Sequence, residues 1–336
     1  MDRLQGKGIV DLHFDLLMRL YEKRTRAGVL RSDFLPDLER GGIVAIAAAI
    51  YIEDRYLPER ALSVGLGQIA RLYTEVAQCD RFAICKSYSD IKRAQKEGKI
   101  AVLIALEGVE PLRDDINLLR AFYELGVRIS GLTHARANAA GSGGIFAPSG
   151  SAPEGLTAFG RDVVRECERL GIIVDLAHIN PAGFDEILEI TSKPLIVSHT
   201  NARKYYDIER NISDEQVRKV GARGGVVGVN SVLVSPRKEE STLDRYVDHL
   251  QHFIDLAGID AVGIGFDFFE FLYREWSEQE RSEFHQKFSN VHFIPGLTNH
   301  AHAPNLRRKL IERGFSDRQI EKILFRNWTR IFRSLL

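Results

Sequence analysis

The sequence of 336 residues is poor in cysteine and has no long apolar run. Its three cysteines, Cys79, Cys85 and Cys167, form no CxxC pair, which excludes a disulfide framework and a cysteine-rich zinc module and favours a reducing compartment. No segment approaches the roughly 18 consecutive apolar residues of a transmembrane helix. The first residues also lack the basic, apolar and small-residue zones of a signal peptide, so we expect a cytoplasmic protein.

Net charge is absent as well, because 46 lysines and arginines balance 46 aspartates and glutamates. This balance argues against electrostatic capture of nucleic acid or of an acidic membrane surface, and we expect neither as a partner. The hydrophobic content of 44% and the aromatic content of 9% fit a well-packed globular protein. The length allows either two domains or one large α/β barrel.

Short apolar, β-branched runs alternate along the chain with charged segments of helical period. We count eight such runs, which we expect to be strands, at 8–13, 42–50, 100–107, 127–134, 172–178, 195–199, 225–230 and 261–267. Amphipathic segments typical of helices lie between them, at 59–77, 116–125, 157–170, 214–220 and 242–257. Strict alternation of strand and helix predicts one (β/α)8 TIM-like barrel domain over 1–336.

A doubly wound open sheet is the rival architecture. Its nucleotide fingerprint, G-x-G-x-x-G/A, has one match at 65–70, but this match lies inside a predicted helix and does not follow a strand. We therefore favour the barrel. We also expect two long rim loops, one at 135–160 that is rich in glycine, with 141–144 its most flexible part, and one at 268–304 that is rich in aromatic residues. The aromatic loop is expected to close over substrate, contact a subunit or pack on its own barrel.

Reactive side chains fall at the ends of the predicted strands. Four histidines and three carboxylates share this position, namely His13, His134, His178, His199, Asp15, Glu107 and Asp267. In a barrel such positions converge on the rim at the carboxyl ends of the strands, where active sites lie. A single histidine there is more often a packed core residue, but a cluster of seven desolvated polar groups requires a metal or a catalytic purpose.

The first strand ends in His13-Phe14-Asp15, and alternation along an extended chain points His13 and Asp15 to the same side. Imidazole and carboxylate suit Zn²⁺, with Mn²⁺, Co²⁺ or Fe²⁺ as substitutes. Glu107 is placed to bridge two ions, and His178 and His199 complete the second site. Two such ions hold a bridging hydroxide near neutral pH.

Distinctive motifs recur in order along the chain, at 10–17 (VDLHFDLL), 105–108 (ALEG), 131–134 (GLTH) followed by Asn138, 171–178 (GIIVDLAH), 194–199 (PLIVSH), 210–214 (RNISD) and 262–268 (VGIGFDF). In these blocks the chain resembles the membrane (renal) dipeptidases, zinc dipeptidases that share the amidohydrolase-type barrel. Several blocks in order over most of the length make a specific signal, whereas a single HxD would be weak.

The resemblance implies a dipeptidase that acts on the peptide bond of a small-molecule dipeptide, with two zinc ions and a homodimeric assembly. One ion is then held by His13, Asp15 and Glu107, and the other by Glu107, His178 and His199. The remaining roles implied are contact of His134 with the scissile carbonyl oxygen, binding of the substrate carboxylate by Arg210, and proton transfer by Asp267. From spacing alone, Arg210 is more simply an exposed charge before a helix.

Two positions depart from the family pattern. Phe14 stands where the family often has asparagine, and Phe269-Glu270 follows Asp267-Phe268 where the family usually has Asp-Gly. Both changes leave the proposed ligands in place, and we expect both to alter the rim near the pocket. Substrate preference is therefore not inherited from the family.

Other readings stay open. The enzyme alternatives are a deaminase, a lactonase or a phosphotriesterase-like activity, although the fourth predicted strand ends without the lysine that bridges metals in many phosphotriesterase-like sites. A binding barrel without turnover is the non-enzymatic alternative. His300 and His302 copy an HxH metal spacing but lie in a loop without a nearby carboxylate, and we expect His249 and His252 to be solvated on one helical face.

Overall fold

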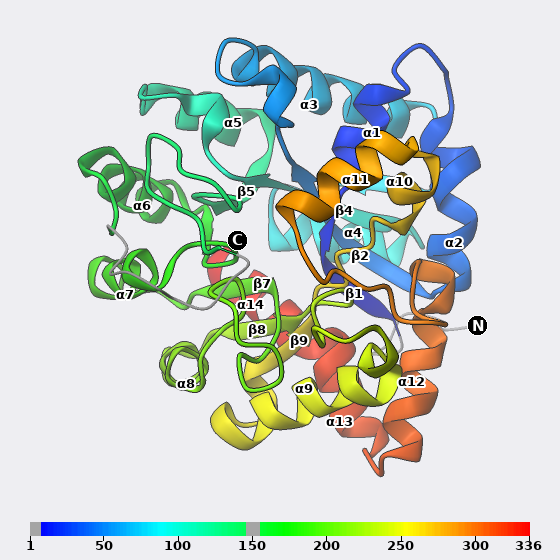
Figure 1. Cartoon of the computed structure of the whole chain (residues 1–336). Helices are drawn as coiled ribbons and strands as arrows, with labels where there is room; N and C mark the ends of the chain where they lie inside the picture. The colour runs from blue at the N-terminus through cyan, green and yellow to red at the C-terminus, as the bar shows by residue number, and fades with distance from the viewer. Residues whose placement is uncertain (1–7, 146–154) are drawn as a thin grey trace.

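The structure is a computed structural model that describes residues 8–145 and 155–336. Eight parallel strands form a nearly closed barrel in the order β1-β2-β4-β5-β6-β7-β8-β9, which confirms the predicted fold class (Figure 1). The strands of the barrel are β1 (Ile9–Phe14), β2 (Ile43–Ile50), β4 (Ile100–Glu107), β5 (Val127–Gly131), β6 (Ile173–Asp175), β7 (Ile196–Thr200), β8 (Val226–Val229) and β9 (Val262–Ile264). A short strand that the sequence pattern did not indicate, β3 (Phe82–Ile84), pairs with β4 outside the barrel path.

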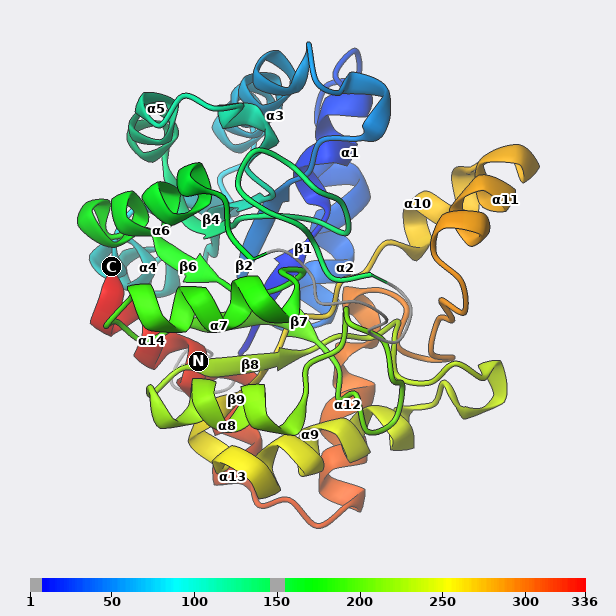
Figure 2. The same ribbon diagram turned by 60° about the vertical axis from the view of Figure 1, so that its left-hand side comes forward.

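Helices surround the strands and cover both ends of the barrel (Figures 1 and 2). They are α1 (Leu16–Glu22), α2 (Leu35–Arg40), α3 (Ala61–Ala77), α4 (Tyr88–Lys96), α5 (Asn117–Leu125), α6 (Ala158–Leu170), α7 (Pro181–Ile190), α8 (Asp214–Ala222), α9 (Leu243–Ala257), α10 (Glu270–Glu275), α11 (Glu278–Lys287), α12 (Ala303–Glu312), α13 (Asp317–Glu321) and α14 (Asn327–Leu335). The five predicted helices are α3, α5, α6, α8 and α9, and the G-x-G-x-x-A match lies inside α3.

The seam between β9 and β1 closes the barrel through one side chain as well as through the backbone. Asp267 donates its backbone N–H to the carbonyl oxygen of His13 at 3.3 Å. The Asp11 carboxylate accepts the backbone N–H of Phe266 at 2.8 Å and contacts His300 Nε2 at 2.8 Å. This pairing binds His300 to the barrel wall, away from His302, which contacts Thr298 instead. The HxH spacing therefore does not form a joint ligand pair.

A register shift in β1 turns the first reactive side chains toward the barrel mouth. Val10 and Leu12 pack inside the barrel, whereas Phe14 belongs to the core between strands and helices. The pairing of β1 with β2 shifts between Asp11 and Phe14, so the simple alternation of faces is interrupted there. This interruption lets His13 face the same pocket as Asp15.

The amino end of the barrel is filled by α14, and the carboxyl end is covered by α10 and α11. Trp328, Ile331 and Phe332 of α14 pack against the inward-facing residues of the strands, and the Trp328 indole N–H donates to Ile264 O at 2.9 Å. Figure 2 shows α10 and α11 standing at the opposite end, beyond the tips of the strands. The pocket described below lies under these two helices.

The two segments predicted to be rim loops differ in how the structure describes them. The second, 268–304, carries α10 and α11 and is therefore largely helical near the barrel mouth. Of the first, residues 146–154 lie outside the described part. Its glycines at 143 and 144 pack closely on the site, because the Gly144 N–H donates to His178 O at 2.6 Å and a Cβ at Gly143 would collide with His134 O.

His249 is buried in α9 and not solvated, which corrects the expectation for this helix face; His252 is buried too. His249 Nδ1 accepts the Ala202 N–H and His249 Nε2 pairs with Val234 O, both at 2.9 Å, so the neutral ring satisfies two backbone groups. Burial lowers the pKa of His249 to about 3. His249 shares its helix face with Tyr246, Leu250 and Phe253, and this apolar spacing places the face toward the core.

Acidification is therefore expected to destabilise the fold through His249. The unfolded chain takes up a proton below about pH 6.5 and the folded chain does so only near pH 3, so stability falls across that window by up to about 5 kcal/mol. In His249→Ala this slope disappears while overall stability drops, because Ala202 N–H and Val234 O lose their partner. Urea unfolding of both proteins between pH 7 and pH 4 measures the effect, and identical slopes would contradict it.

Candidate functional site

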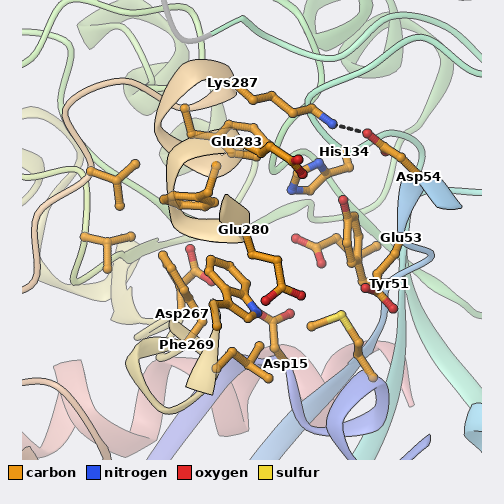
Figure 3. A pocket seen from close by; sticks show the side chains of 18 of the residues that line it. Asp15, Tyr51, Glu53, Asp54, His134, Asp267, Phe269, Glu280, Glu283 and Lys287 are labelled. Atoms are coloured by element: carbon orange, nitrogen blue, oxygen red, sulfur yellow. Dashed lines mark hydrogen bonds and ion pairs between the residues drawn. The ribbon is translucent and has the colours of Figure 1, made fainter. Parts of the chain in front are cut away.

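A pocket of about 440 Å³ opens at the carboxyl ends of the strands (Figure 3). The predicted site residues that line it are Asp15, Glu107, His134, His178, Arg210 and Asp267. Each comes from the end of a different strand or from the connection that follows it. The topology thus brings together in space residues that are up to 252 positions apart in sequence, as the strand-end pattern indicated.

Three histidines surround one oxygen of Glu107, the last residue of β4. Glu107 Oε1 lies 3.1 Å from His178 Nε2, 3.4 Å from His13 Nε2 and 3.7 Å from His199 Nε2. His178 Nε2 and His199 Nε2 are 3.0 Å apart. Four ligand-type atoms from β1, β4, β7 and the connection after β6 therefore converge on one small volume.

Two further carboxylates lie near the same nitrogen of His13. Its Nε2 is 3.6 Å from Asp15 Oδ1 and 3.8 Å from Asp267 Oδ1. Within the described residues, three sets have ligand atoms all within 4.8 Å of one another: His13, Glu107 and His199; Glu107, His134 and His178; and His13, Asp15 and Asp267. These sets contain all five predicted metal ligands and also bring in His134 and Asp267.

Neighbouring polar side chains hold the histidines and carboxylates of the cluster in place. Ser198 Oγ lies 2.8 Å from His199 Nδ1, so Nε2 of that ring faces Glu107. Asn230 donates its side-chain N–H to Asp267 Oδ2 at 2.7 Å. Sequence reasoning did not select Ser198 or Asn230, although both stand at the ends of predicted strands, and that position alone was a usable signal.

The cluster has strongly perturbed protonation equilibria. Burial opposes protonation of His13, but the surrounding carboxylates, Glu107 first, outweigh it and raise the pKa of His13 to about 10. Burial raises the pKa of Glu107 to about 8 and that of Asp267 to about 6. Burial, reinforced by nearby positive charge, holds the pKa of His178 and His199 well below the usual range, so both rings are neutral near pH 7.

The donor set fits a divalent metal. His13 Nε2 is buried and has no hydrogen-bond partner, although three carboxylates lie within 4 Å of it. Zn²⁺ and related ions bind neutral imidazoles and carboxylates, so a bound ion would displace the proton that the surrounding carboxylates otherwise hold on His13. Positive charge at the centre would compensate three clustered carboxylates that are otherwise costly to bury together.

Arg210 is buried against this cluster and is not an exposed charge before a helix. It is 3% exposed, and its Nη2 donates to His199 O at 3.0 Å. Its Nε and Nη1 are buried without a hydrogen-bond partner, and the residue lines the pocket. A guanidinium with two unsatisfied N–H groups at a pocket wall is suited to bind a carboxylate.

Of the two departures from the family pattern, only Phe269 lines the pocket. It packs with Phe284 and Phe293 in a cluster that fixes α11 over the site. Phe14 is 1% exposed and packs on Phe34 and His300 behind the site, so the expectation that it alters the rim is wrong. The register shift of β1 is the reason, since it turns Phe14 outward while His13 turns inward.

The fold and the cluster together define a (β/α)8 barrel protein with a candidate metal centre at the carboxyl ends of its strands. The sequence profile of "Membrane dipeptidase (Peptidase family M19)" matches residues 3–281. The chain therefore belongs to the membrane dipeptidase family, which is a family of metallopeptidases, and this membership implies a bound metal.

Solved structures are similar over nearly the whole chain. One, a dipeptidase described as a metallopeptidase of the same family, has a TM-score of 0.84 and 27% identity and covers 98% of both chains. Another, a metallopeptidase from Rhodobacter sphaeroides bound to a phosphinate mimic of the dipeptide L-Ala-D-Ala, has a TM-score of 0.85 and 25% identity, covering 98% of this chain and 99% of that one.

A curated relative, an uncharacterized dipeptidase of Schizosaccharomyces pombe, is 32% identical over 213 residues, which are 60% of this chain and 51% of that protein. The matched part of the chain thus spans about half the length of this relative. None of the helices in the described ranges has the length and apolar character needed to cross a bilayer.

Proposed function

We propose that this chain is a metal-dependent dipeptidase that hydrolyses the peptide bond of dipeptides. The observation that carries the proposal is the arrangement in one pocket of a metal-ligand cluster and an unsatisfied, buried guanidinium, that of Arg210. A dipeptide offers a carbonyl to the cluster and a terminal carboxylate to Arg210. The pocket volume of about 440 Å³ suits a substrate of that size.

In this proposal two Zn²⁺ ions, or Mn²⁺ or Co²⁺ in their place, are held by His13, Asp15 and Glu107 and by Glu107, His178 and His199. Bound there, the ions supply Lewis acidity for the scissile carbonyl and lower the pKa of attacking water. The contacts of Glu107 with all three histidines support its role as the shared ligand.

His134 is proposed to contact the scissile carbonyl oxygen. Its ring lies between the rings of Tyr51 and His178, at centroid distances of 4.7 and 4.3 Å. Burial, together with the charges of Arg136 and Arg210, holds the pKa of His134 well below the usual range. The neutral ring carries one N–H, which can donate to an oxygen that gains negative charge.

Asp267 is proposed to accept the proton of the attacking water and deliver it to the departing amine. Its carboxylate lies on the pocket wall beside Asp15 and His13, and Asn230 fixes its orientation. A carboxyl group whose pKa is raised by burial is a better proton acceptor than an exposed aspartate.

Arg210 gives a prediction that isolates the substrate carboxylate. Arg210→Met is expected to lower kcat/KM for a free dipeptide by about 10- to 150-fold, because a charge-assisted hydrogen bond is lost. Amidating the carboxylate should cost the wild-type enzyme a similar factor and the variant little more, since both changes delete one interaction. If the two penalties multiply, Arg210 does not bind the carboxylate.

Turnover of an L,L and L,D dipeptide panel by the metal-analysed protein tests the function itself. Peptide-bond cleavage releases a new α-amine, whereas a deaminase releases ammonia without one. A lactonase or phosphotriesterase would hydrolyse esters and leave the dipeptides of the panel intact. Metal-replete protein that is inert toward both the dipeptide panel and the esters would instead support a binding barrel.

We also propose a cytoplasmic location and a homodimer. Cys79, Cys85 and Cys167 are buried and free, which supports a reducing compartment. Light scattering of the purified protein measures the assembly, and a monomeric mass would remove the dimer.

A further inference from the structure

The outer wall of the pocket carries more carboxylates than cations. Beyond the metal-ligand cluster, the lining carboxylates among the described residues are Glu22, Glu53, Asp54, Glu280 and Glu283, and the lining cations other than Arg210 are Arg55 and Lys287. Lys287 is bound to Asp54, which also pairs with Arg136. The excess of negative charge therefore lies on the remaining four glutamates.

Arg55 is shared as an ion-pair partner by two of these carboxylates, Glu53 and Glu22. Arg55 Nη2 lies 2.9 Å from Glu53 Oε2 and 3.6 Å from Glu22 Oε1. Glu22 also contacts Arg19 at 3.0 Å, but Arg19 is shared with Glu275 outside the pocket. Burial raises the pKa of Glu53, and the charges of Glu22 and Glu280 raise it further in spite of Arg55. Glu53 is thus a partly desolvated carboxylate with too little positive charge around it.

Glu280, on α11, adds a third carboxylate to the pocket lining. The backbone N–H and hydroxyl of Ser277 donate to its Oε2 at 2.7 and 2.8 Å, which fixes the side chain at the start of α11 and lowers its pKa. Figure 3 shows the Glu280 carboxylate pointing into the pocket, toward the side from which Glu53 comes.

Glu53 lies across the barrel mouth from Arg210. Glu53 directly follows β2, and Arg210 lies in the connection after β7. The strand order places β4, β5 and β6 between β2 and β7 on one side and β1, β9 and β8 on the other, so the two positions are diametrically opposite. A dipeptide whose carboxylate binds Arg210 therefore points its N-terminal residue at Glu53.

Apolar groups line the same pocket as these carboxylates. Met18, Leu272 and Trp276 border the same pocket, as does the ring of Tyr51. A lysine or arginine side chain has a long apolar stem and a cationic end, so it can pack its stem on such a surface and present its charge to the carboxylates beyond.

We propose that this wall is the subsite for the side chain of the N-terminal residue and that it selects a cationic one, lysine or arginine, with Glu53 and Glu280 as specificity-determining residues. The inference rests on the proposed dipeptidase function and on Arg210 as the carboxylate-binding group. It adds the substrate class that the family membership does not define.

The test compares Lys-Ala with norleucyl-Ala, a dipeptide of nearly equal side-chain length without the charge. Wild-type enzyme is expected to favour Lys-Ala in kcat/KM by about tenfold, between the values typical of an exposed ion pair and of a buried charge-assisted hydrogen bond. Glu53→Gln and Glu280→Gln should each lower this ratio several-fold. Glu278→Gln, on the same helix but outside the pocket lining, is the matched control and should leave the ratio unchanged. Metal content and Tm verify that all variants fold alike.

The ratio separates the possible failures. A wild-type ratio near one with good turnover of both dipeptides overturns the subsite while the dipeptidase function stands. Equal losses for both substrates in Glu53→Gln mean that the wall binds the α-ammonium group and not the side chain, which also overturns the proposal. No turnover of either dipeptide overturns the proposed function and this inference together.

Discussion

Replacing Asp267 with asparagine is expected to reduce kcat by about 10²- to 10⁴-fold, the usual contribution of a positioned proton-transfer group. Asparagine matches aspartate in shape but cannot accept the proton of the attacking water. Asp267 has φ +59°, a left-handed conformation in which asparagine is among the most tolerated residues, so the variant should keep its backbone. The measurement is single-turnover and steady-state kinetics on one well-hydrolysed dipeptide.

Metal content decides between two roles for Asp267. The carboxylate lies in a possible ligand set with His13 and Asp15, so a direct role as a ligand is geometrically open. Near wild-type metal content in Asp267→Asn, combined with the kinetic loss, supports proton transfer. Loss of metal would make Asp267 a ligand, and full activity would remove it from the mechanism.

Asn230→Ala provides the graded control. It leaves the Asp267 carboxylate in place but deletes the donor at 2.7 Å that orients it. We expect a smaller loss than in Asp267→Asn and a displaced pH–rate profile, because Asn230 stabilises the ionised form. An unchanged pH profile would reduce Asn230 to a structural contact.

The convergence of the ligands could be predicted from sequence because parallel strands of a barrel share one carboxyl end. Glu107, His178 and His199 need only their positions in the strand order to meet. For the same reason Asn230 was within reach of prediction. Arg210 followed from the family resemblance but not from spacing, because it lies in a long connection whose path depends on packing and not on a period.

Local signals account for the two other discrepancies. Ser277 and Glu280 form an S-x-x-E capping box that marks the start of α11, but the aromatic residues of this segment have no helical period and favoured a loop. His249 lies on the buried face of α9 with Tyr246, Leu250 and Phe253. A histidine on such a face needs polar partners, and the backbone groups of Ala202 and Val234 supply them.

Removing divalent metal is expected to abolish turnover, and adding back Zn²⁺, or Mn²⁺ or Co²⁺, should restore it. The chelated protein should also unfold at a lower temperature, because a ligand at about 1,000 times its Kd stabilises the folded state by about 4 kcal/mol.

The Glu107→Gln variant should lose most of its metal, since Glu107 Oε1 is within 3.7 Å of the Nε2 atoms of His13, His178 and His199. Glu283→Gln lines the same pocket away from the cluster and should retain its metal. Metal analysis and thermal unfolding measure both variants, and a chelated protein with unchanged activity and Tm would contradict a metal-dependent mechanism.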